Sequence, residues 1–381
     1  MDKPVMHGPL ANGPLMSSTL MNRPLMGRPA MDGSRATGSE GGRRVDGRRA
    51  GTDPRRPRLA VLATAAALAA LVTAGCSAGY QIGARPTVAP IQPGTLVTGG
   101  ASGSAAPTQA PTCDPTALSL APTAGDAGSP DVQKIKTRGK LIVGVSQDGY
   151  LTGYLNAAGQ EEGFDIDIAR QVERAIFGTT GDDHIQFIPV TLDQRISDLQ
   201  KGSVDIVVDT MTITCARAQL VDFSTVYYEA SQRLLVLKNQ AGRPMYTTLA
   251  DLKPSQRVCV QVGSTSANSI LSKPNHPQLY EVQDASDCLV ALQQNEADAV
   301  STDDTLLAGL EVQDGNTAVT GPPIEQEPYG IAMSQNTPSL VRFVNGVLAD
   351  IRGNGTWTAI YDRWFKSSLQ DAAPPPAAYA H

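Results

Sequence analysis

The chain has 381 residues, of which 18% are charged, and it carries a formal net charge of −6. This length accommodates two ordinary domains with further segments. Because the charge balance is acidic, the composition gives no indication of a nucleic-acid-binding protein. The five cysteines form an odd number, which in an exported protein indicates disulfide pairs and one thiol with another use.

Residues 1–58 are predicted to be a disordered N-terminal extension. Gly, Pro, Arg and Met dominate there, and no apolar residue recurs with a helical or strand period. Near-repeats such as "GPLANGPLM" occur in its first 31 residues, which contain six of the nine methionines. Two interpretations remain open: a disordered cytoplasmic tail, or a translation start downstream of Met1.

Residues 59–76 have the order of a lipoprotein signal segment. The basic "RRPR" precedes the apolar run "LAVLATAAALAALV", which is shorter than the about 20 residues of a membrane span. The following "TAGCS" places small residues directly before Cys76, and this resembles the bacterial lipobox. Thr73 stands where that motif usually has Leu, Val or Ile. We expect Cys76 to be acylated, with an uncleaved anchor or a plain secretory signal as alternatives.

Residues 77–130 are rich in Ala, Pro, Gly, Ser and Thr and cannot bury enough apolar surface to fold alone. We expect them to tether the folded part to a membrane. If Cys76 carries lipid, four cysteines remain, and in an oxidising compartment these form two disulfides by default. With only four histidines in the chain, Cys215 is disfavoured as a catalytic nucleophile.

Beyond the tether, strands alternate with helices, which is typical of an α/β sheet with crossover helices. Residues 140–146 are predicted to form a β-branched strand. Residues 163–178 are predicted to form a helix, because apolar residues recur at helical spacing, acids stand at its start and Gly at its end. A strand at 184–190, a helix at 194–202 and a strand at 204–213 complete a β-α-β-α-β lobe.

A second lobe is predicted from a strand, polar loop and helix start at residues 257–271 and a helix-strand-helix at 287–310. The chain then returns through "PYGIAMS" to an amphipathic stretch at 339–365. Because parts of one lobe precede and follow the other, the chain crosses between them twice, as in hinged binding proteins. The predicted boundaries are lobe 1 at 131–232 and 326–368, lobe 2 at 233–325, and a disordered tail at 369–381.

Several motifs occur in a characteristic order: "GFDIDIARQV", "LQKGSVDIVVDTMTITCARAQLVDFSTVYY", "VGSTS", "ADAVSTD", "PYGIAMS" and "GNGTWTAIYDRWF". From about residue 134 to 366 the chain therefore resembles bacterial solute-binding proteins of family 3, the polar amino-acid binding proteins of ABC importers, of the glutamate/glutamine-binding type. The resemblance implies an α/β, two-lobed periplasmic-binding-protein fold with two hinge crossings, similar to type II. It also implies a free amino acid as ligand and an ABC permease as partner.

The resemblance assigns the ligand carboxylate to Arg217, whose planar guanidinium can make two parallel charge-assisted hydrogen bonds. Thr212 would add a hydroxyl and an amide, and Thr210 belongs to the same strand end. From the second lobe, the loop with Ser264 and Thr265 would add backbone N–H groups where a helix begins. By spacing alone, Arg217 would be interpreted as a surface helix residue.

The ligand ammonium is assigned to Asp303, at the end of "ADAVSTD". Asp304 takes this role if the register differs by one residue, and Asp303 by itself is also an ordinary helix N-cap. Tyr150 is the candidate to stack on the ligand, with Tyr154 as the alternative.

The disulfide pairing follows from the same assignment of lobes. Cys259 and Cys288 both fall in the second lobe, on a strand and a helix that can pack together. Cys113 and Cys215 fall before or in the first lobe. Four cysteines allow three connectivities, and we predict Cys259–Cys288 and Cys113–Cys215. The second bridge would fasten the tether beside the loop that carries Arg217.

The favoured function is a lipid-anchored receptor on the extracytoplasmic face of the membrane, which delivers a polar amino acid to a permease. An amino-acid sensor that reports to a membrane signalling partner is the alternative. An enzyme is disfavoured because no general acid or base stands out beyond the binding set. The sequence indicates no cofactor and no metal site.

Arg195 bears on which amino acid binds. It opens the helix before the motif strand, where family members that bind aspartate or glutamate often carry an arginine aimed at the ligand side chain. A second carboxylate in a water-poor cleft needs its own cation. We therefore predict glutamate or aspartate, with glutamine or asparagine weaker. The other interpretation is that Arg195 only caps this helix or pairs with Asp198.

Overall fold

The computed structural model describes residues 94–97, 113–124, 126–178 and 181–380. The chain divides into two compact units, Met1–Arg85 and Pro86–His381, and all described residues belong to the second. The predictions for the N-terminal extension, the signal segment and Cys76 therefore lie outside the described residues. None of the helices within these ranges combines the length and the apolar character that a membrane span needs.

The first lobe contains a five-stranded sheet in the order β6-β2-β7-β14-β8. β2 pairs in parallel with β6 and β7, and β14 pairs antiparallel with β7 and β8. The strands are β2 Leu141–Val145, β6 Ile185–Pro189, β7 Ile206–Val207, β8 Asp222–Phe223 and β14 Ala332–Met333. Its helices are α2 Pro130–Arg138, α3 Phe164–Phe177, α4 Arg195–Lys201, α5 Cys215–Ala218, α9 Pro338–Gly353 and α10 Thr356–Trp364. A separate small sheet consists of β3 Asp148–Gly149, β4 Gly153–Leu155 and β5 Glu161–Glu162.

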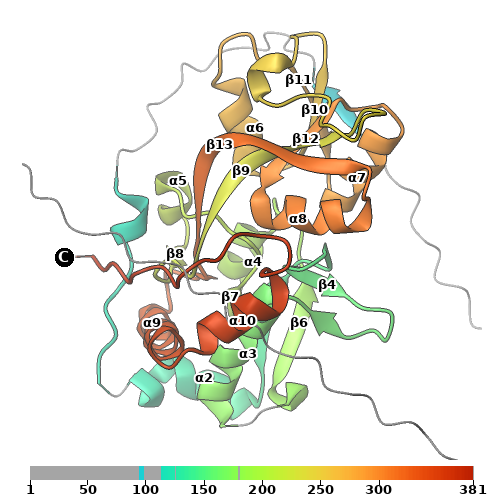
Figure 1. Ribbon diagram of the computed structural model, residues 1–381. Coiled ribbons are helices and arrows are strands. Elements are labelled where there is room, and N and C mark those ends of the chain that lie inside the picture. The colour runs from blue at the N-terminus through green and yellow to red at the C-terminus, as the bar shows by residue number, and fades with distance from the viewer. Residues whose placement is uncertain (1–93, 98–112, 125, 179–180, 381) are drawn as a thin grey trace, which may run out of the picture. The chain divides into compact units, whose positions relative to one another are not determined.

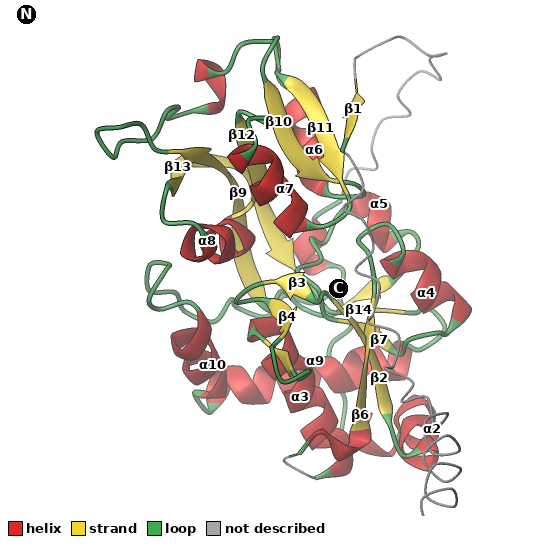
Figure 2. Cartoon of the chain, turned by 90° about the vertical axis from the view of Figure 1, so that its right-hand side faces the viewer, coloured by secondary structure: helices red, strands yellow, loops and turns green. Residues whose placement is uncertain are grey.

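The second lobe contains a six-stranded sheet in the order β1-β11-β10-β12-β9-β13. The strands are β1 Thr95–Val97, β9 Tyr228–Leu237, β10 Arg257–Gln261, β11 Gln278–Val282, β12 Ala299–Asp303 and β13 Thr317–Tyr329. Its helices are α6 Thr265–Leu271, α7 Ala285–Gln293 and α8 Asp304–Gln313, which Figure 2 shows beside these strands. Single 3-10 turns occur at Pro115–Ala117, Asp126–Gly128, Asp182–His184 and Leu249–Asp251.

Two long antiparallel strands, β9 and β13, connect the lobes (Figure 1). They belong to the second lobe's sheet along most of their length, and Tyr228 faces Tyr329 where they reach the first lobe. There Thr212 forms an isolated bridge with Tyr329, and the Gly330 amide donates to the Met211 carbonyl. The arrangement confirms the predicted α/β fold of two lobes.

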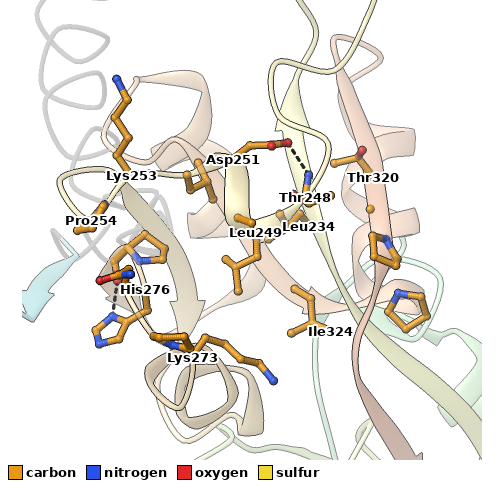
Figure 3. A pocket seen from close by; sticks show the side chains of 18 residues that line it. Leu234, Thr248, Leu249, Asp251, Lys253, Pro254, Lys273, His276, Thr320 and Ile324 are labelled. Carbon is orange, nitrogen blue, oxygen red and sulfur yellow. Dashed lines mark hydrogen bonds between the residues drawn. The ribbon is translucent and has the colours of Figure 1, made fainter.

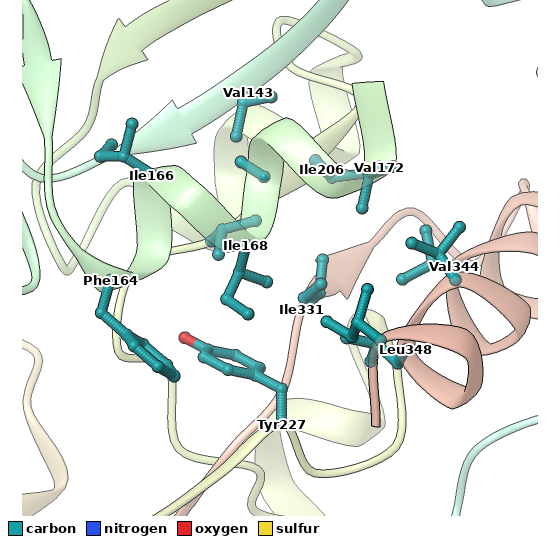
Figure 4. Close-up of a cluster of buried hydrophobic side chains, with 14 of the residues drawn as sticks. Val143, Phe164, Ile166, Ile168, Val172, Ile206, Tyr227, Ile331, Val344 and Leu348 are labelled. Carbon is teal, nitrogen blue, oxygen red and sulfur yellow. The ribbon is translucent and has the colours of Figure 1, made fainter. Parts of the chain in front are cut away.

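The first lobe's core forms around α3, as Figure 4 shows. The helix begins after Gly163, whose φ is +134° and whose Cβ, if it had one, would stand 2.2 Å from the Thr152 carbonyl oxygen. Helical spacing then places Ile168 and Val172 on one buried face. These side chains pack in one apolar cluster with residues of β2 and α9. The packing holds the strands in place, and with them the polar residues that follow the strand ends.

Residues 369–380 form no helix or strand, but they contact the first lobe. The Tyr361 hydroxyl donates to the Gln370 carbonyl, and the Ala380 amide donates to the Ser119 carbonyl at 2.8 Å. These contacts hold residues 369–380 along a defined path on the first lobe. The sequence predicted a disordered tail at 369–381 and no such contacts.

Candidate functional site

A small cavity lies where the two lobes meet. It has a volume of about 20 Å³ and is lined by Leu192, Arg195, Thr210, Thr212, Arg217, Gln261, Ser264, Thr265, Ser266, Thr302, Asp303 and Leu306. Such a volume holds about one water molecule. An amino acid therefore enters only when the lobes or the lining side chains move apart.

Arg217 joins the two lobes across this cavity. It lies in the short helix α5, whose N-cap Thr214 accepts a hydrogen bond from the Arg217 amide at 3.1 Å. Nη1 donates to the Thr212 carbonyl at 2.8 Å, and Nη2 donates to the second lobe's Gly263 carbonyl at 3.1 Å. Burial and the nearby Arg195 lower the pKa of Arg217 to about 9, so its side chain is still a cation at neutral pH.

The second-lobe loop closes on the first lobe at Gly263. Its φ is +79°, and a Cβ there would stand 3.1 Å from the Asp193 amide nitrogen. Glycine is therefore required both by the backbone conformation and by the close approach. Ser264 follows as the N-cap of α6, which begins at Thr265. Both residues line the cavity, and their predicted contact with the ligand carboxylate stays a prediction.

Asp303 is buried at the end of β12 and occupies the N-cap position of α8 without a capping hydrogen bond from its side chain. Its Oδ2 accepts a hydrogen bond from the Tyr329 hydroxyl at 2.7 Å. Burial and the neighbouring Glu327 carboxylate raise the pKa of Asp303 well above its usual value. Asp303 lines the cavity and Asp304 does not, which favours the first of the two registers that the sequence left open.

Arg195 is only 2% exposed and lines the cavity from the first lobe. Nε donates to the Leu192 carbonyl at 3.1 Å and Nη1 to the Asp209 carbonyl at 2.7 Å. Nη1 also lies 3.7 Å from the Asp209 carboxylate, whose pKa burial raises to about 7. Asp198, the partner considered from the sequence, pairs with Lys201 instead.

Thr210 is held in an unusual conformation by a buried acid. Its φ is +43°, and its amide donates to Asp165 Oδ2 at 2.7 Å. The Tyr227 hydroxyl donates to the other carboxylate oxygen at 2.8 Å. Burial raises the pKa of Asp165 to about 7, although both hydrogen bonds oppose this shift. The two hydrogen bonds to Asp165 fix the segment after β7, from which Thr210 and Thr212 reach the cavity.

Tyr150 is placed differently from the prediction that it stacks on the ligand. Its ring lies 4.9 Å from that of Tyr154, and neither residue lines the cavity. The Tyr150 carbonyl packs directly against the backbone of Gly309 in α8, at a place that a Cβ on residue 309 would occupy. The Tyr150 loop therefore contacts the second lobe through its backbone. Leu306 supplies the apolar wall of the cavity from the same helix.

Sequence reasoning missed several lining residues: Leu192, Gln261, Ser266, Thr302 and Leu306. Gln261 stands two residues before Gly263, and its place at the end of β10 beside a recognised loop was an available signal. Leu192 and Leu306 had no comparable signal, because an apolar residue in a loop or helix start looks like any core residue.

Both predicted disulfides are present. Cys113 bonds Cys215, with 5.8 Å between their Cα atoms, and Cys259 bonds Cys288, with 5.5 Å. Cys215 is the first residue of α5, so the first bridge attaches residue 113, within the predicted tether, to the helix that carries Arg217.

A larger apolar pocket of about 740 Å³ lies within the second lobe (Figure 3). Leu234, Leu249 and Ile324 contribute to its walls. Asp251 accepts a hydrogen bond from the Thr248 amide beside it, and the His276 ring contacts the carbonyl of its own neighbour. Asp251, Lys253 and Lys273 also line this pocket, whereas the cavity between the lobes combines Arg217 and Asp303 with several hydroxyl side chains.

Comparison with known proteins identifies the family. Residues 141–367 match the family described as bacterial extracellular solute-binding proteins, family 3. The chain belongs to this family. It is 37% identical to the ABC transporter glutamine-binding protein GlnH of Bacillus subtilis, covering 61% of this chain and 83% of that protein. It is 30% identical to the glutamate-binding protein GluB of Corynebacterium glutamicum, covering 58% and 76%. A solved ancestral arginine-binding protein bound to glutamine is 32% identical, with a TM-score of 0.54, covering 60% and 98%.

Proposed function

We propose that the protein is the substrate-binding component of an ABC amino-acid importer and captures a polar amino acid between its lobes. One observation carries this proposal: Arg217 from the first lobe and Asp303 from the second line the same cavity. Solute-binding proteins of this family bind free amino acids and deliver them to ABC permeases, which supports the same conclusion. The relatives are binding proteins, and they lend no support to a signalling partner.

The two charges of a free amino acid match the two ends of this cavity. The carboxylate would take the Arg217 donors that now bond the carbonyls of Thr212 and Gly263, and backbone N–H groups near Thr265 would add to them. The ammonium would lie at Asp303. Each buried charge then meets an opposite charge, which avoids a cost of several kcal/mol for an unpaired one.

Arg195 is proposed to contact the ligand side chain. Within the described residues, its Nη2 makes no hydrogen bond, whereas Nε and Nη1 are both engaged. An oxygen of either glutamine or glutamate can accept from Nη2. With a pKa of about 7, Asp209 is partly ionised at neutral pH and offsets part of the Arg195 charge, so a second ligand carboxylate meets less positive charge than the sequence suggested. We therefore propose glutamine as the preferred ligand and glutamate as the second candidate.

We also propose that Cys76 carries the lipid that holds the protein on the extracytoplasmic face of the membrane. The support is the order of basic, apolar and small residues before this cysteine. Mass spectrometry of protein from its native membrane should find diacylglyceryl on Cys76. A free N-terminus at another residue would contradict the assignment.

A calorimetric binding screen of the twenty amino acids tests the proposed function. We expect glutamine to bind tightest, with glutamate next. Tight binding of lysine, arginine or histidine without glutamine or glutamate would refute the ligand assignment and leave the receptor function intact. No binding of any amino acid would refute the function itself.

A further inference from the structure

Glu327 is a buried acid on the hinge that none of the assignments above uses. It lies in β13, opposite Ala230 of β9, and is 1% exposed. The Thr265 hydroxyl of the second lobe donates to its Oε2 at 2.7 Å. The Thr212 side chain of the first lobe lies beside the same carboxylate and helps to lower its pKa. One hinge carboxylate thus contacts cavity-lining residues of both lobes.

Charged side chains from two elements, α5 and β13, act on the Glu327 carboxylate. Arg217 favours the ionised carboxylate, whereas Glu325 on the same strand opposes it. Burial raises the pKa of Glu327, and the Glu327 carboxylate in turn raises the pKa of Asp303. Asp304 and the Tyr329 hydroxyl face Asp303 in the same group. Asp303 and Glu327 are therefore coupled electrostatically to each other and to Arg217.

We propose that Glu327 is a positioning residue for the ligand ammonium group. The inference rests on the proposed function, because it requires a ligand with both an ammonium and a carboxylate. A hydroxyl has one hydrogen to donate and two lone pairs. Since Thr265 donates its hydrogen to Glu327, its hydroxyl oxygen presents only acceptor lone pairs to the cavity it lines.

Acceptor lone pairs attract an ammonium and repel a carboxylate. Glu327 thereby makes the Thr265 hydroxyl part of the ammonium site and leaves the ligand carboxylate to Arg217 and the backbone N–H groups. Its negative charge next to Asp303 acts in the same direction, because opposite charges attract strongly where water is excluded. Because Glu327 lies on the hinge, its carboxylate can orient the Thr212 hydroxyl of the first lobe as well as the Thr265 hydroxyl of the second lobe.

The geometry also implies a dependence on pH. A proton on the Asp303 and Glu327 pair neutralises the charge that attracts the ammonium, so it competes with the ligand. Because the pKa of each acid is raised, this competition extends above the usual carboxyl range. Asp165 and Asp209, with pKa values of about 7, lie on the Arg195 side and titrate in the same range. A Glu327 variant leaves the titration of Asp165 and Asp209 unchanged. Comparing it with the wild-type protein therefore separates their effect on affinity from the effect of the Asp303 and Glu327 pair.

The test compares Glu327→Gln with Glu325→Gln in calorimetric titrations with L-glutamine, or with whichever amino acid binds tightest in the screen. Glu325 is the matched control, since it lies on the same strand, is 56% exposed and pairs only loosely with Lys273 at 3.9 Å. We expect Glu327→Gln to weaken binding by about 10- to 100-fold, because the negative charge beside Asp303 is lost and the Thr265 hydroxyl then donates to a neutral amide oxygen in place of a carboxylate. Glu325→Gln should stay within about twofold, as for a surface substitution.

A second readout separates this role from a merely structural one. From pH 7.5 down to pH 5, the affinity of the wild-type protein should fall, and that of Glu327→Gln should fall less steeply. Glu327→Asp, which keeps the charge, should recover most of the affinity and the pH dependence. Equal affinities and equal pH profiles for Glu327→Gln and Glu325→Gln would overturn the inference while the proposed function stands. A wild-type protein that binds no amino acid would overturn both.

Discussion

Two arginines reach the same cavity from the first lobe, and they are held in different ways. Arg217 lies on a four-residue helix fastened by a disulfide, and its guanidinium bonds backbone carbonyls from both lobes. Arg195 is 2% exposed, opens the longer helix α4, and has the Asp209 carboxylate 3.7 Å away.

The difference indicates which arginine can exchange its partners for a ligand. A backbone carbonyl is a neutral acceptor, so a ligand carboxylate that replaces it gives Arg217 a stronger hydrogen bond in which both partners are charged. Arg195 already has a buried acid, and removing that contact would leave a charge unpaired. We therefore expect Arg217 to supply binding energy and Arg195 to supply stability and ligand preference.

The largest effect is expected from Arg217→Ala. Breaking a buried charge pair typically costs about 3–5 kcal/mol, so glutamine affinity should fall by more than about 100-fold. The fold should persist, because Arg217 makes only backbone hydrogen bonds. Calorimetry on variant protein with an unchanged thermal midpoint checks both parts. Affinity within a few fold of wild type would make the carboxylate assignment wrong.

Arg195→Gln should act mainly on stability. It removes a charge-assisted hydrogen bond and the cation beside Asp209, so the free energy of unfolding should fall by about 2 kcal/mol. Any remaining loss of affinity should be greater for glutamate than for glutamine. Urea unfolding and calorimetry with both ligands measure the two effects. Unchanged stability with binding lost for both ligands would mean that the two arginines have the same role.

The sequence predicted the groups that belong to contiguous motifs. Arg217, Thr212 and Asp303 line the cavity, because a strand end followed by a short helix start leaves little freedom for where those side chains lie. Tyr150 could not be placed, since its loop is positioned by backbone packing against Gly309, more than a hundred residues later in the chain. Asp209 as the partner of Arg195 was missed for a related reason: Asp198 is nearer in sequence, but the fold brings the strand end closer.

Loss of the Cys113–Cys215 bridge should affect binding through Arg217 alone. With both cysteines changed to Ser, α5 loses its covalent attachment to residue 113, and we expect glutamine affinity to fall by about tenfold, or 1.4 kcal/mol. The matched control is the double Ser variant of Cys259 and Cys288, which lie buried in the second lobe. That variant should lose about 3 kcal/mol of stability and keep its affinity. Equal affinities for the two variants would contradict a link between tether and site.

A further effect is a pH slope in stability from Asp209. Its pKa is about 7 in the folded protein, whereas an unfolded Asp titrates near 3.9. Between about pH 4 and 7 the folded state therefore holds protons that the unfolded chain does not, and stability falls as pH rises. Asp209→Asn should flatten this slope by at most about 1.4 kcal/mol per pH unit, and exposed Asp362→Asn should not. Urea unfolding at pH 5, 6 and 7 measures it, and identical slopes would argue against a buried, protonated Asp209.

A crystal structure of the protein with L-glutamine tests the central claim most directly. We expect the ligand carboxylate to lie within hydrogen-bonding distance of Arg217, which would then release the Gly263 carbonyl, and the ammonium to lie against Asp303. Glutamine bound in the reverse orientation, or in the apolar pocket of the second lobe instead of between the lobes, would contradict the account.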